Sequence, residues 1–559
     1  GEPIFCTGCL EPSAASRIAK SRCPRYTCPF PYTPAKSGPR CAVFPFMAPK
    51  GESAVPTKPF MPHISKEYNR AYGGKVTRAS IAGMAGIEER PRDLVYELGL
   101  LEKMSNVRVN GTPLKNVPFG DGYSIWHRFV LFVFSSDIKR FSVARNFEAY
   151  LNGEGGRDAS LSLKGFFVGM FGVLISCVAW AAVSVMKPRV ILFGIDRVSD
   201  SEFKSDFRTR SLHAYLRKKH ISYAECLHTV FNVSFLGNVF IRLRPVFYLE
   251  ALDTWYAVLK RIGMAKKSVA PELSGLDAFT VEERKFASYV IKKYLGEVGL
   301  VEFRVDMLTA FIRASGACAV WMIDDARHYH DVALAAKIAG IPSYAFQHGH
   351  FTRYHVGWLK NGSVLSYVRP DFLVLWSEYW EKELMRLGSV FPDSALIVGG
   401  FPERASVLPL KKAGHPLILI PHETDSPKTE VAAFIKQILT DVPSARIVMK
   451  LRPDYPREGQ MRAYPTENAG GRISAVTNLS ELTESPSAVL GVYSSFLYDM
   501  VSVGVPVGLM ETSMDYGKGL VENGLADSVS LDGISSWISA SGAMSDSELE
   551  KRKKSLMSD

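Results

Sequence analysis

The chain has 559 residues, of which 47% are hydrophobic and 22% are charged, and its formal net charge is +11 at pH 7. This composition is ordinary for a soluble globular protein, and the length predicts two to four domains. The excess of positive charge favours an anionic partner: a nucleotide, a phosphorylated lipid or a membrane surface. Because no dense basic run is interleaved with aromatic residues, nucleic acid is disfavoured as a partner.

Residues 1–63 form a leader rich in proline and cysteine, in which basic residues outnumber acidic ones. It holds five of the chain's eight cysteines; the other three stand singly in apolar segments, which indicates a reduced, intracellular main body. The lack of apolar periodicity predicts a disordered leader, or translated sequence upstream of a true start at Met47 or Met61. The alternatives are a transit peptide and a zinc knuckle built from Cys6, Cys9, Cys23 and Cys28.

Residues 64–187 are expected to form an N-terminal extension of short helices and strands. Within it, Trp126 to Ser136 is an aromatic-rich run that predicts either a strand or a half-buried helix. Residues 165–185 carry no charge over 21 residues, which is long enough for a helix to span a bilayer. Because Pro188 and a strand follow almost at once, we expect membrane contact rather than a span, and a helix buried in the protein stays an alternative.

From Pro188 onward, apolar runs of strand length alternate with segments of helical period. Such alternation predicts an α/β fold, in which a parallel sheet carries helices on both faces. We expect a first Rossmann-like domain over residues 188–402 and, after a proline-containing linker, a second one over residues 403–541. Two such domains would face each other across a cleft, a common place for ligands. The polar tail, residues 542–559, is expected to fray.

One predicted strand–helix–strand unit, residues 316–358, carries five of the chain's twelve histidines. Its first strand, Ala317 to Ile323, ends on a pair of aspartates. Its second strand, Ser343 to Gln347, leads into the sequence Gln-His-Gly-His. In open α/β sheets, ligands bind just outside the carboxyl ends of the strands. This unit is therefore the best place in the chain to expect chemistry.

Five polar residues at predicted strand ends are candidates for catalysis. A transferase needs a carboxylate or a histidine to accept a hydroxyl proton, or a carboxylate nucleophile where configuration is retained. His348 is the strongest candidate, because Gly349 lets the backbone approach a ligand and a histidine titrates near neutral pH. An aspartate at a strand end can equally be a helix N-cap, and that alternative stays open for Asp325. The candidates are Asp196, Asp324, Asp325, His348 and His350.

Known cofactor motifs are absent or incomplete. The sequence has no P-loop GxxxxGK[ST], no GxGxxG after a strand and no HExxH, which disfavours ATP hydrolysis and dinucleotide redox chemistry. His328 and His330, beside the paired aspartates, could bind a divalent metal. Histidine-rich loops of this kind suit a phosphate or a sugar better, so no metal site is predicted.

The second predicted domain has the features of a nucleotide site. Backbone N–H groups and hydroxyls at Ser494 and Ser495 suit a phosphate, although one serine can be only an N-cap. Lys450 and Arg452 stand at a strand end where cations could neutralise a diphosphate, unless they form a solvated edge. Glu511 could bind ribose hydroxyls. The full set of donor-site candidates is His422, Lys450, Arg452, Tyr493, Ser494, Ser495 and Glu511.

Several segments together resemble a known family. They are QHGH at 347–350, PDFLVLWSEYWEKEL at 370–384, GG at 399–400, KLRPD at 450–454 and YSSFLYDMVSVGVPVG at 493–508. Over residues 120–530 the chain resembles GT-B glycosyltransferases of bacterial surface-polysaccharide assembly. It is similar to the Kdo-, sialyl- and glycerophosphate-transferring enzymes of capsule and lipopolysaccharide.

The resemblance implies two Rossmann-like domains facing a cleft, a nucleotide held mainly by the C-terminal one, and no obligatory metal. By the same resemblance, Ser494 and Ser495 match the paired serines that hold a donor phosphate in CMP-sugar enzymes. Where those enzymes often have a His-Pro pair, this chain has Arg452 and Pro453.

We therefore expect a glycosyltransferase that moves a sugar from a CMP- or NDP-linked donor to a lipid-linked or oligosaccharide acceptor. Its expected location is cytoplasmic, peripheral on the inner face of the cytoplasmic membrane. The alternatives are a CDP-polyol phosphotransferase, a nucleotide-sugar 2-epimerase and, among non-enzymes, a glycan-binding scaffold subunit of an export complex. The sequence does not predict the sugar, the linkage, the stereochemical outcome or the oligomeric state.

Overall fold

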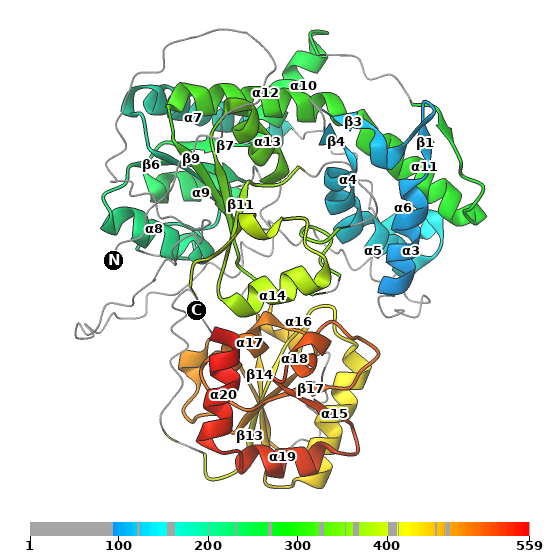
Figure 1. Ribbon diagram of the computed structural model, residues 1–559, viewed down its shortest axis with the longest axis vertical. Helices are drawn as coiled ribbons and strands as arrows, with labels where there is room; N and C mark the ends of the chain where they lie inside the picture. Colours follow the sequence, from blue (N-terminus) through cyan, green and yellow to red (C-terminus); the bar gives the residue numbers. More distant parts are fainter. Residues whose placement is uncertain are drawn as a thin grey trace, which may run out of the picture.

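The computed structural model describes residues 93–557 apart from short segments: 120–122, 154–162, 201, 230, 232, 266–270, 324–328, 353, 361–367, 401–410, 412, 453–455, 463 and 465–469. The predicted leader, the predicted linker for the most part, and the candidates Asp324, Asp325 and His328 lie outside the described residues. Within them, two α/β domains stand one above the other, and a smaller helical extension flanks the upper one (Figure 1).

The N-terminal domain is built on a seven-stranded parallel sheet, as its continuous apolar runs predict. The strand order is β12-β11-β10-β9-β5-β6-β7. Strands β5, β6 and β7 follow one another toward one edge of the sheet, and β9 to β12 follow one another from β5 toward the opposite edge. The direction in which successive strands are added reverses between β5 and β9. The carboxyl ends of these two strands therefore form the topological switch point of the sheet. The strands are β5 (Val190–Ile195), β6 (Tyr223–His228), β7 (Val246–Tyr248), β9 (Ala319–Ile323), β10 (Ser343–Phe346), β11 (Phe372–Leu375) and β12 (Leu396–Val398).

The C-terminal domain repeats this plan with six parallel strands in the order β15-β14-β13-β16-β17-β18. The reversal falls between β13 and β16, and this order is the one found in dinucleotide-binding sheets. The strands are β13 (Leu417–Pro421), β14 (Arg446–Lys450), β15 (Ile473–Val476), β16 (Ala488–Gly491), β17 (Val507–Met510) and β18 (Asp527–Val529). The helices are α15 (Lys428–Asp441), α16 (Arg457–Met461), α17 (Ser495–Ser502), α18 (Lys518–Glu522), α19 (Ile534–Gly542) and α20 (Asp546–Met557).

The helices of the N-terminal domain cover both faces of its sheet. Three of them, α7, α10 and α12, pack together at the end of the molecule farthest from the C-terminal domain (Figure 1). The helices are α7 (Leu163–Met186), α8 (Arg210–Lys218), α9 (Val233–Arg242), α10 (Glu250–Arg261), α11 (Val281–Gly296), α12 (Val298–Ser315), α13 (Tyr329–Ala339) and α14 (Glu378–Leu387).

The N-terminal extension is mainly helical, and the aromatic run that predicted a strand or a helix is a helix. Trp126, Phe129 and Val130 are buried on one side of it at helical spacing. The extension packs on α11 through the stacked rings of Phe141 and Phe286, whose centroids are 4.1 Å apart. Its elements are α3 (Leu94–Ser105), β1 (Arg108–Val109), β2 (Thr112–Pro113), β3 (Pro118–Phe119), β4 (Tyr123–Ser124), α4 (Trp126–Phe132), a π-helical turn (Val133–Ile138), α5 (Lys139–Ala144) and α6 (Phe147–Gly153); β1 also pairs with β8 (Leu273–Ser274).

A buried ionic network ties the extension to the Rossmann-like domain. The Arg128 guanidinium donates to Asp331 at 2.7 and 3.2 Å and to the Tyr294 hydroxyl at 2.9 Å. Arg304 also donates to Asp331 Oδ2 at 2.7 Å, and it donates to Asp253 at 3.1 Å. Burial opposes ionisation of Asp331, but the two guanidinium groups hold the pKa of its carboxyl below the ordinary value. Two buried cations therefore share one buried anion.

Asp331→Ala is expected to lower the free energy of unfolding by about 3–5 kcal/mol, because it leaves buried guanidinium charge without its partner. Urea unfolding followed by circular dichroism measures the change. Asp306→Ala, which removes an exposed aspartate from the neighbouring helix α12, is the control and should change stability by about 0.5 kcal/mol or less. Equal stability of the two variants would contradict a structural role for the network.

The polar tail differs from the expectation that it frays. Residues 546–557 form α20, which packs against α14 of the N-terminal domain and α17 of its own domain. Leu556 is fully buried, and its carbonyl accepts a hydrogen bond of 2.6 Å from the Ser377 hydroxyl. One buried leucine in a charged segment gives almost no periodic signal, so the sequence does not reveal that this helix returns to the other domain.

Candidate active site

The carboxyl ends of the two sheets meet. After β10, the ring of His350 stacks on Tyr498 of α17, with centroids 5.5 Å apart. The Tyr354 hydroxyl donates to Asp515 at 2.7 Å, and its ring lies 5.2 Å from that of Tyr516. Tyr498 lies in α17, which follows β16 at the switch point, and Asp515 and Tyr516 follow the neighbouring strand β17. The loop after β10, which carries the predicted histidines, therefore lies against the C-terminal domain.

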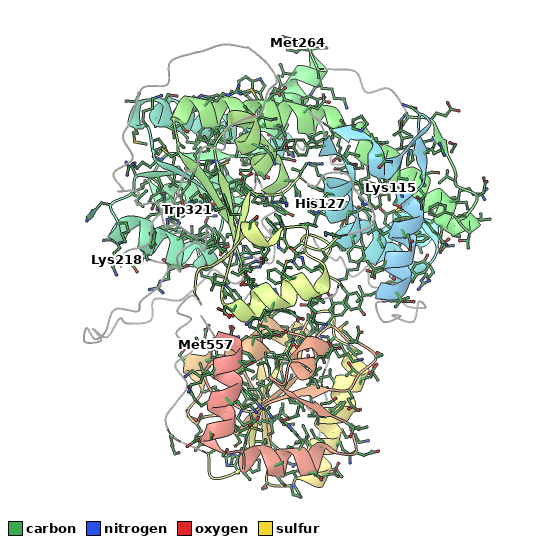
Figure 2. All side chains as sticks on the ribbon, in the orientation of Figure 1. Lys115, His127, Lys218, Met264, Trp321 and Met557 are labelled. Atoms are coloured by element: carbon green, nitrogen blue, oxygen red, sulfur yellow. The ribbon has the colours of Figure 1, made fainter. Side chains whose placement is uncertain are left out.

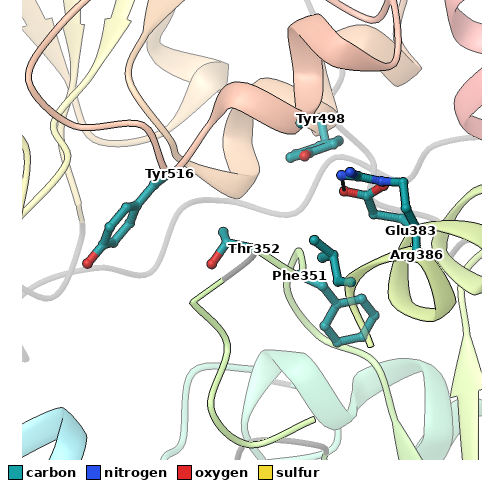
Figure 3. Close-up of a pocket in the computed structure, with 8 residues that line it drawn as sticks. Phe351, Thr352, Glu383, Arg386, Tyr498 and Tyr516 are labelled. Atoms are coloured by element: carbon teal, nitrogen blue, oxygen red, sulfur yellow. Dashed lines mark hydrogen bonds and ion pairs between the residues drawn. The ribbon is translucent and has the colours of Figure 1, made fainter. Parts of the chain in front are cut away.

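A small pocket lies at this junction (Figure 3). Phe351 and Thr352 line it from the N-terminal domain, and Tyr498 and Tyr516 line it from the C-terminal domain. At its edge, the carboxylate of Glu383 pairs with Arg386 at 2.8 Å. The pocket is thus formed by both domains, and neither domain contains it alone.

Helix α14 fixes the two domains on one side of the pocket. The Asn523 amide donates to the Tyr379 hydroxyl at 3.0 Å and to Glu383 at 3.3 Å. On another side, Lys139 of α5 forms an ion pair of 2.5 Å with Asp425, which follows β13. Contacts from α14, from α5 and from the loop after β10 therefore hold the C-terminal domain against the first domain.

The Gln-His-Gly-His turn after β10 is held by its glutamine. The Gln347 amide donates to the carbonyl of Gly349 at 2.8 Å and accepts from the Trp376 N–H at 3.0 Å. The Trp376 indole in turn donates to the Gln347 carbonyl at 2.7 Å. His348 is half-buried within this turn. Sequence analysis identified the histidines but not Gln347, which fixes the turn that carries them.

His350 is a neutral, enclosed imidazole. Its Nε2 is buried and has no hydrogen-bond partner among the described residues. Burial, followed by the charges of His355 and His348, lowers the pKa of His350 to about 4. A ring that stays neutral at pH 7 and stacks on Tyr498 suits an interdomain contact better than proton transfer. Its predicted catalytic role remains a prediction.

Glu423 occupies the switch point of the C-terminal sheet. Its carboxylate follows β13 and accepts hydrogen bonds from the backbone N–H groups of Val492, Tyr493 and Ser494, which follow β16, at 2.9, 2.8 and 2.6 Å. Burial raises the pKa of Glu423 above its ordinary value, and these hydrogen bonds counter part of the rise. A Cβ on Gly491 would lie 3.3 Å from this carboxylate, so glycine leaves room for it.

The turn before α17 therefore differs from the arrangement that the sequence suggested. The Ser494 N–H, which was expected to face a phosphate, donates to Glu423 instead. The Ser494 hydroxyl caps α17 by accepting from the Phe496 N–H at 3.2 Å. The Tyr493 hydroxyl accepts from the Asp425 N–H at 3.1 Å. Phosphate binding by Ser494 and Ser495 stays a prediction, and the Ser494 N–H is already engaged by Glu423.

A cationic cluster lies beside Glu423. Lys428, the first residue of α15, donates to the Glu423 carbonyl and to the Ser426 hydroxyl. Arg452, which follows β14, reaches Thr424 at 3.4 Å. An ammonium group at the N-terminus of a helix is opposed by the helix dipole. The cluster therefore gathers positive charge where an anion would be stabilised.

Burial dominates the titration of the cluster. Burial lowers the pKa of Lys428 to about 8, against the attraction of Glu423 and Asp425. Burial, and then the charges of Lys428 and Arg452, lower the pKa of His422 to about 4. Its Nδ1 lies 2.9 Å from the Tyr464 hydroxyl. Perturbed groups at a strand edge are typical of functional sites.

The other candidates lie at different places on these edges. Asp196 is buried at the end of β5, where it pairs with Arg242 and accepts from the Thr229 hydroxyl at 2.7 Å. Lys450 donates to the Leu451 carbonyl at 2.9 Å. Glu511 is exposed and accepts from Ser528 at 2.8 Å. The structure brings His422, Lys450 and Arg452 to adjoining strand ends, and it gives Asp196 a structural ion pair.

Sequence analysis missed Glu423, Lys428 and Tyr498. A signal existed for Glu423, since it stands beside His422 directly after a buried strand. Lys428 opens a helix, where a lysine is unfavourable, and this could have marked it. Nothing marks Tyr498, because its role depends on the approach of the other domain. In the described part of the chain, no group of three or more His, Cys, Asp or Glu side chains could hold a metal ion.

Comparison with known proteins gives matches among solved structures. No protein-family model and no curated protein matches the chain. It is similar to the calicheamicin glycosyltransferase CalG4 (12% identity, 66% of this chain and 94% of that chain, TM-score 0.40). It is also similar to MurG from Acinetobacter baumannii (12% identity, 66% of this chain and 94% of that chain, TM-score 0.38). A third similar structure is the UDP-GlcNAc 2-epimerase from Neisseria meningitidis bound to UDP-GlcNAc (11% identity, 66% of this chain and 94% of that chain, TM-score 0.38).

The strand order itself defines the fold. Two parallel sheets of Rossmann order face each other at their carboxyl ends, and this is the GT-B architecture. The predicted α/β fold class is thereby confirmed.

Proposed function

We propose that the protein is a glycosyltransferase that moves a sugar from a CMP- or NDP-linked donor to a hydroxyl of a lipid-linked or oligosaccharide acceptor. The donor nucleotide lies against the C-terminal sheet, and the acceptor approaches from the N-terminal sheet. By the resemblance of its motifs, the acceptor belongs to capsule or lipopolysaccharide synthesis at the inner face of the cytoplasmic membrane.

One observation carries the proposal: the loop after β10 contacts α17 and the loop after β17. A transferase must hold a leaving phosphate and an attacking alcohol within reach of each other. In this fold the strand ends that would hold them come from different domains. The contact of His350 with Tyr498, and of Tyr354 with Asp515, joins these ends.

The proposed roles follow from charge. Cations stabilise the phosphate as the bond between the anomeric carbon and the phosphate oxygen breaks and the electron pair moves to that oxygen. Lys428, Arg452 and Lys450 supply this charge from the ends of β14 and the start of α15. The acceptor oxygen forms the new bond to the anomeric carbon, and its proton passes to His348.

A donor panel tests the reaction class with the full chain. CMP-, UDP- and GDP-sugars are incubated with and without oligosaccharide and lipid-linked acceptors, and released nucleotides and sugar products are separated by chromatography. A glycosyltransferase releases nucleotide in step with glycosylated acceptor. Conversion of a UDP-sugar to its 2-epimer without acceptor, or transfer of polyol phosphate from a CDP-polyol, would replace the proposal with the corresponding alternative. Binding without turnover would support the scaffold alternative.

His348→Asn is expected to lower kcat by roughly 10²- to 10⁴-fold, because it removes the proposed proton acceptor. The melting temperature should stay within about 2 °C of that of the parent protein, since His348 is a half-buried loop residue. The matched control is His220→Asn, at an exposed turn whose φ of 52° an asparagine tolerates. Undiminished turnover in His348→Asn would remove His348 from the site.

A further inference from the structure

Helix α7 turns several large apolar side chains to solvent. Its exposed positions recur at helical spacing along its whole length, and all of them are apolar or cysteine. Leu174 is 60% exposed and Val185 is 83% exposed. From Phe167 to Val185 this face is roughly 27 Å long at 1.5 Å per residue. Its members are Phe167, Met170, Leu174, Cys177, Val178, Ala181, Val185 and Met186; we call them the outer face of α7.

The fully buried positions of the same helix are glycine, serine, alanine and valine, and the rings of Phe171 and Trp180 pack beside them. A Cβ on Gly169 would lie 2.7 Å from Thr254 of α10, and one on Gly172 would lie 2.3 Å from the ring of Phe231. The Ser176 hydroxyl accepts from the Tyr248 N–H of β7 at 3.0 Å. Helix α7 is therefore apolar on both faces, whereas a surface helix usually turns charged or polar side chains to water.

Among the described residues, Gly165–Met186 is long and apolar enough to cross a membrane, with a mean hydropathy of 2.3. Of its 18-residue apolar window, 28% is buried inside the protein. Spanning would require α7 to leave α10, α12 and β7, against which it packs. A helix that keeps these contacts and still removes its outer face from water must lie parallel to a bilayer surface.

We propose that the outer face of α7 docks on the surface of an anionic lipid bilayer, with the helix lying in the interface. Cations flank it: Lys187 and Arg189 follow α7, and Lys260 and Arg261 end the neighbouring α10, all exposed. No acidic residue occurs between Ser160 and Ile195. Lysine and arginine side chains are attracted to an anionic bilayer surface.

The same charges disfavour a second copy of the chain as the occupant. A symmetric dimer through the outer face would bring together two surfaces that carry the same excess of positive charge. Lipid headgroups of opposite charge complement them instead. The exposed Ile262 and Met264, just past the end of α10, extend the apolar surface beside the basic pair.

Docking in this way leaves the C-terminal domain away from the bilayer. Helices α7 and α10 lie at the end of the N-terminal domain opposite to it, and Met264 lies at the same extreme end (Figure 2). The C-terminal strand edges then stay open to soluble ligands. This inference does not depend on the proposed function, because it concerns a surface remote from the candidate site.

Vesicle flotation of the full chain tests the proposal. The chain should float with vesicles of phosphatidylglycerol and phosphatidylcholine and less with pure phosphatidylcholine. Leu174→Glu/Val178→Glu should reduce the bound fraction about tenfold or more, because two apolar contacts are lost and two negative charges are added. The control, Val95→Glu/Val281→Glu, makes the same changes at positions 77% and 66% exposed in the first turns of α3 and α11, and should bind as the parent does.

Circular dichroism and melting temperature show that both double variants remain folded. Equal flotation of the two variants, or no flotation of the parent with anionic vesicles, would overturn the proposal. A dimer of the parent in gel filtration that Leu174→Glu/Val178→Glu dissociates, together with no vesicle binding, would assign the outer face to a second copy and would equally overturn it.

Discussion

Lys428→Ala is expected to weaken binding of a nucleoside diphosphate by roughly 10- to 100-fold. A charge-assisted hydrogen bond contributes about 1.5–3 kcal/mol, and each 1.4 kcal/mol corresponds to a tenfold change in Kd. Lys428 has three N–H donors, and two of them are used by the Glu423 carbonyl and the Ser426 hydroxyl. The third can reach an anion at the start of α15. Isothermal titration with CDP, UDP and GDP measures the effect.

The matched control is Lys436→Ala, which removes an exposed lysine from the same helix. It changes the net charge equally, so it should reproduce only the small general effect of losing one positive charge. If both variants bind as tightly as the parent, the cationic cluster is not the phosphate site. The turn at Ser494 and Ser495 is then the better candidate for binding the phosphate.

The pH dependence of binding gives the same prediction a second readout. Lys428 binds an anion only when protonated, and its pKa in the free protein is about 8. Affinity should therefore be greatest below pH 8 and fall as the pH rises from 7 to 9, more steeply than an ordinary lysine would allow. Lys428→Arg keeps its charge throughout this range and should abolish the fall. A fall that persists in Lys428→Arg would assign it to another group.

Glu423→Ala is expected to lower the free energy of unfolding by about 3–5 kcal/mol. It leaves three backbone N–H groups at the switch point without their acceptor, and each buried, unsatisfied donor costs about 1–3 kcal/mol, partly recovered by water. It also removes the carboxylate nearest to the Lys428 ammonium. Urea unfolding measures the change, and the slope with denaturant should stay the same if only stability is affected.

Two further variants make this result specific. Glu511→Ala removes an exposed carboxylate with one partner, Ser528, and should change stability by less than about 1 kcal/mol. Glu423→Gln keeps the shape and one acceptor oxygen and should fall between the other two. If Glu423→Ala matches Glu511→Ala, the carboxylate does not hold the switch point together.

The strands of both sheets were predictable because buried parallel strands are continuous apolar runs. Ala319–Ile323 and Leu417–Pro421 stand out in this way, with polar residues directly after them. The run Trp126 to Ser136 left helix and strand open, because aromatic residues suit both. No sequence pattern predicted the packing of helix α20, because Leu556 is its one fully buried side chain.

The candidate site was predictable only as a set of strand ends. Glu423 and Ser494 are 71 positions apart, and their hydrogen bond follows from the pairing of β13 with β16, which no local pattern encodes. The contact between His350 and Tyr498 depends likewise on how the domains meet. The outer face of α7 was visible as an uncharged segment, but which of its residues face water required the packing against Thr254 and Phe231.

The central claim is that the strand ends of the two domains form one nucleotide site. A crystal structure of the full chain soaked with CDP tests it most directly. The account predicts the phosphates within hydrogen-bond distance of Lys428 and Arg452, with the terminal phosphate directed toward the turn that carries His348. A nucleotide bound on any other surface, or bound at these residues with its phosphates directed away from the N-terminal domain, would contradict it.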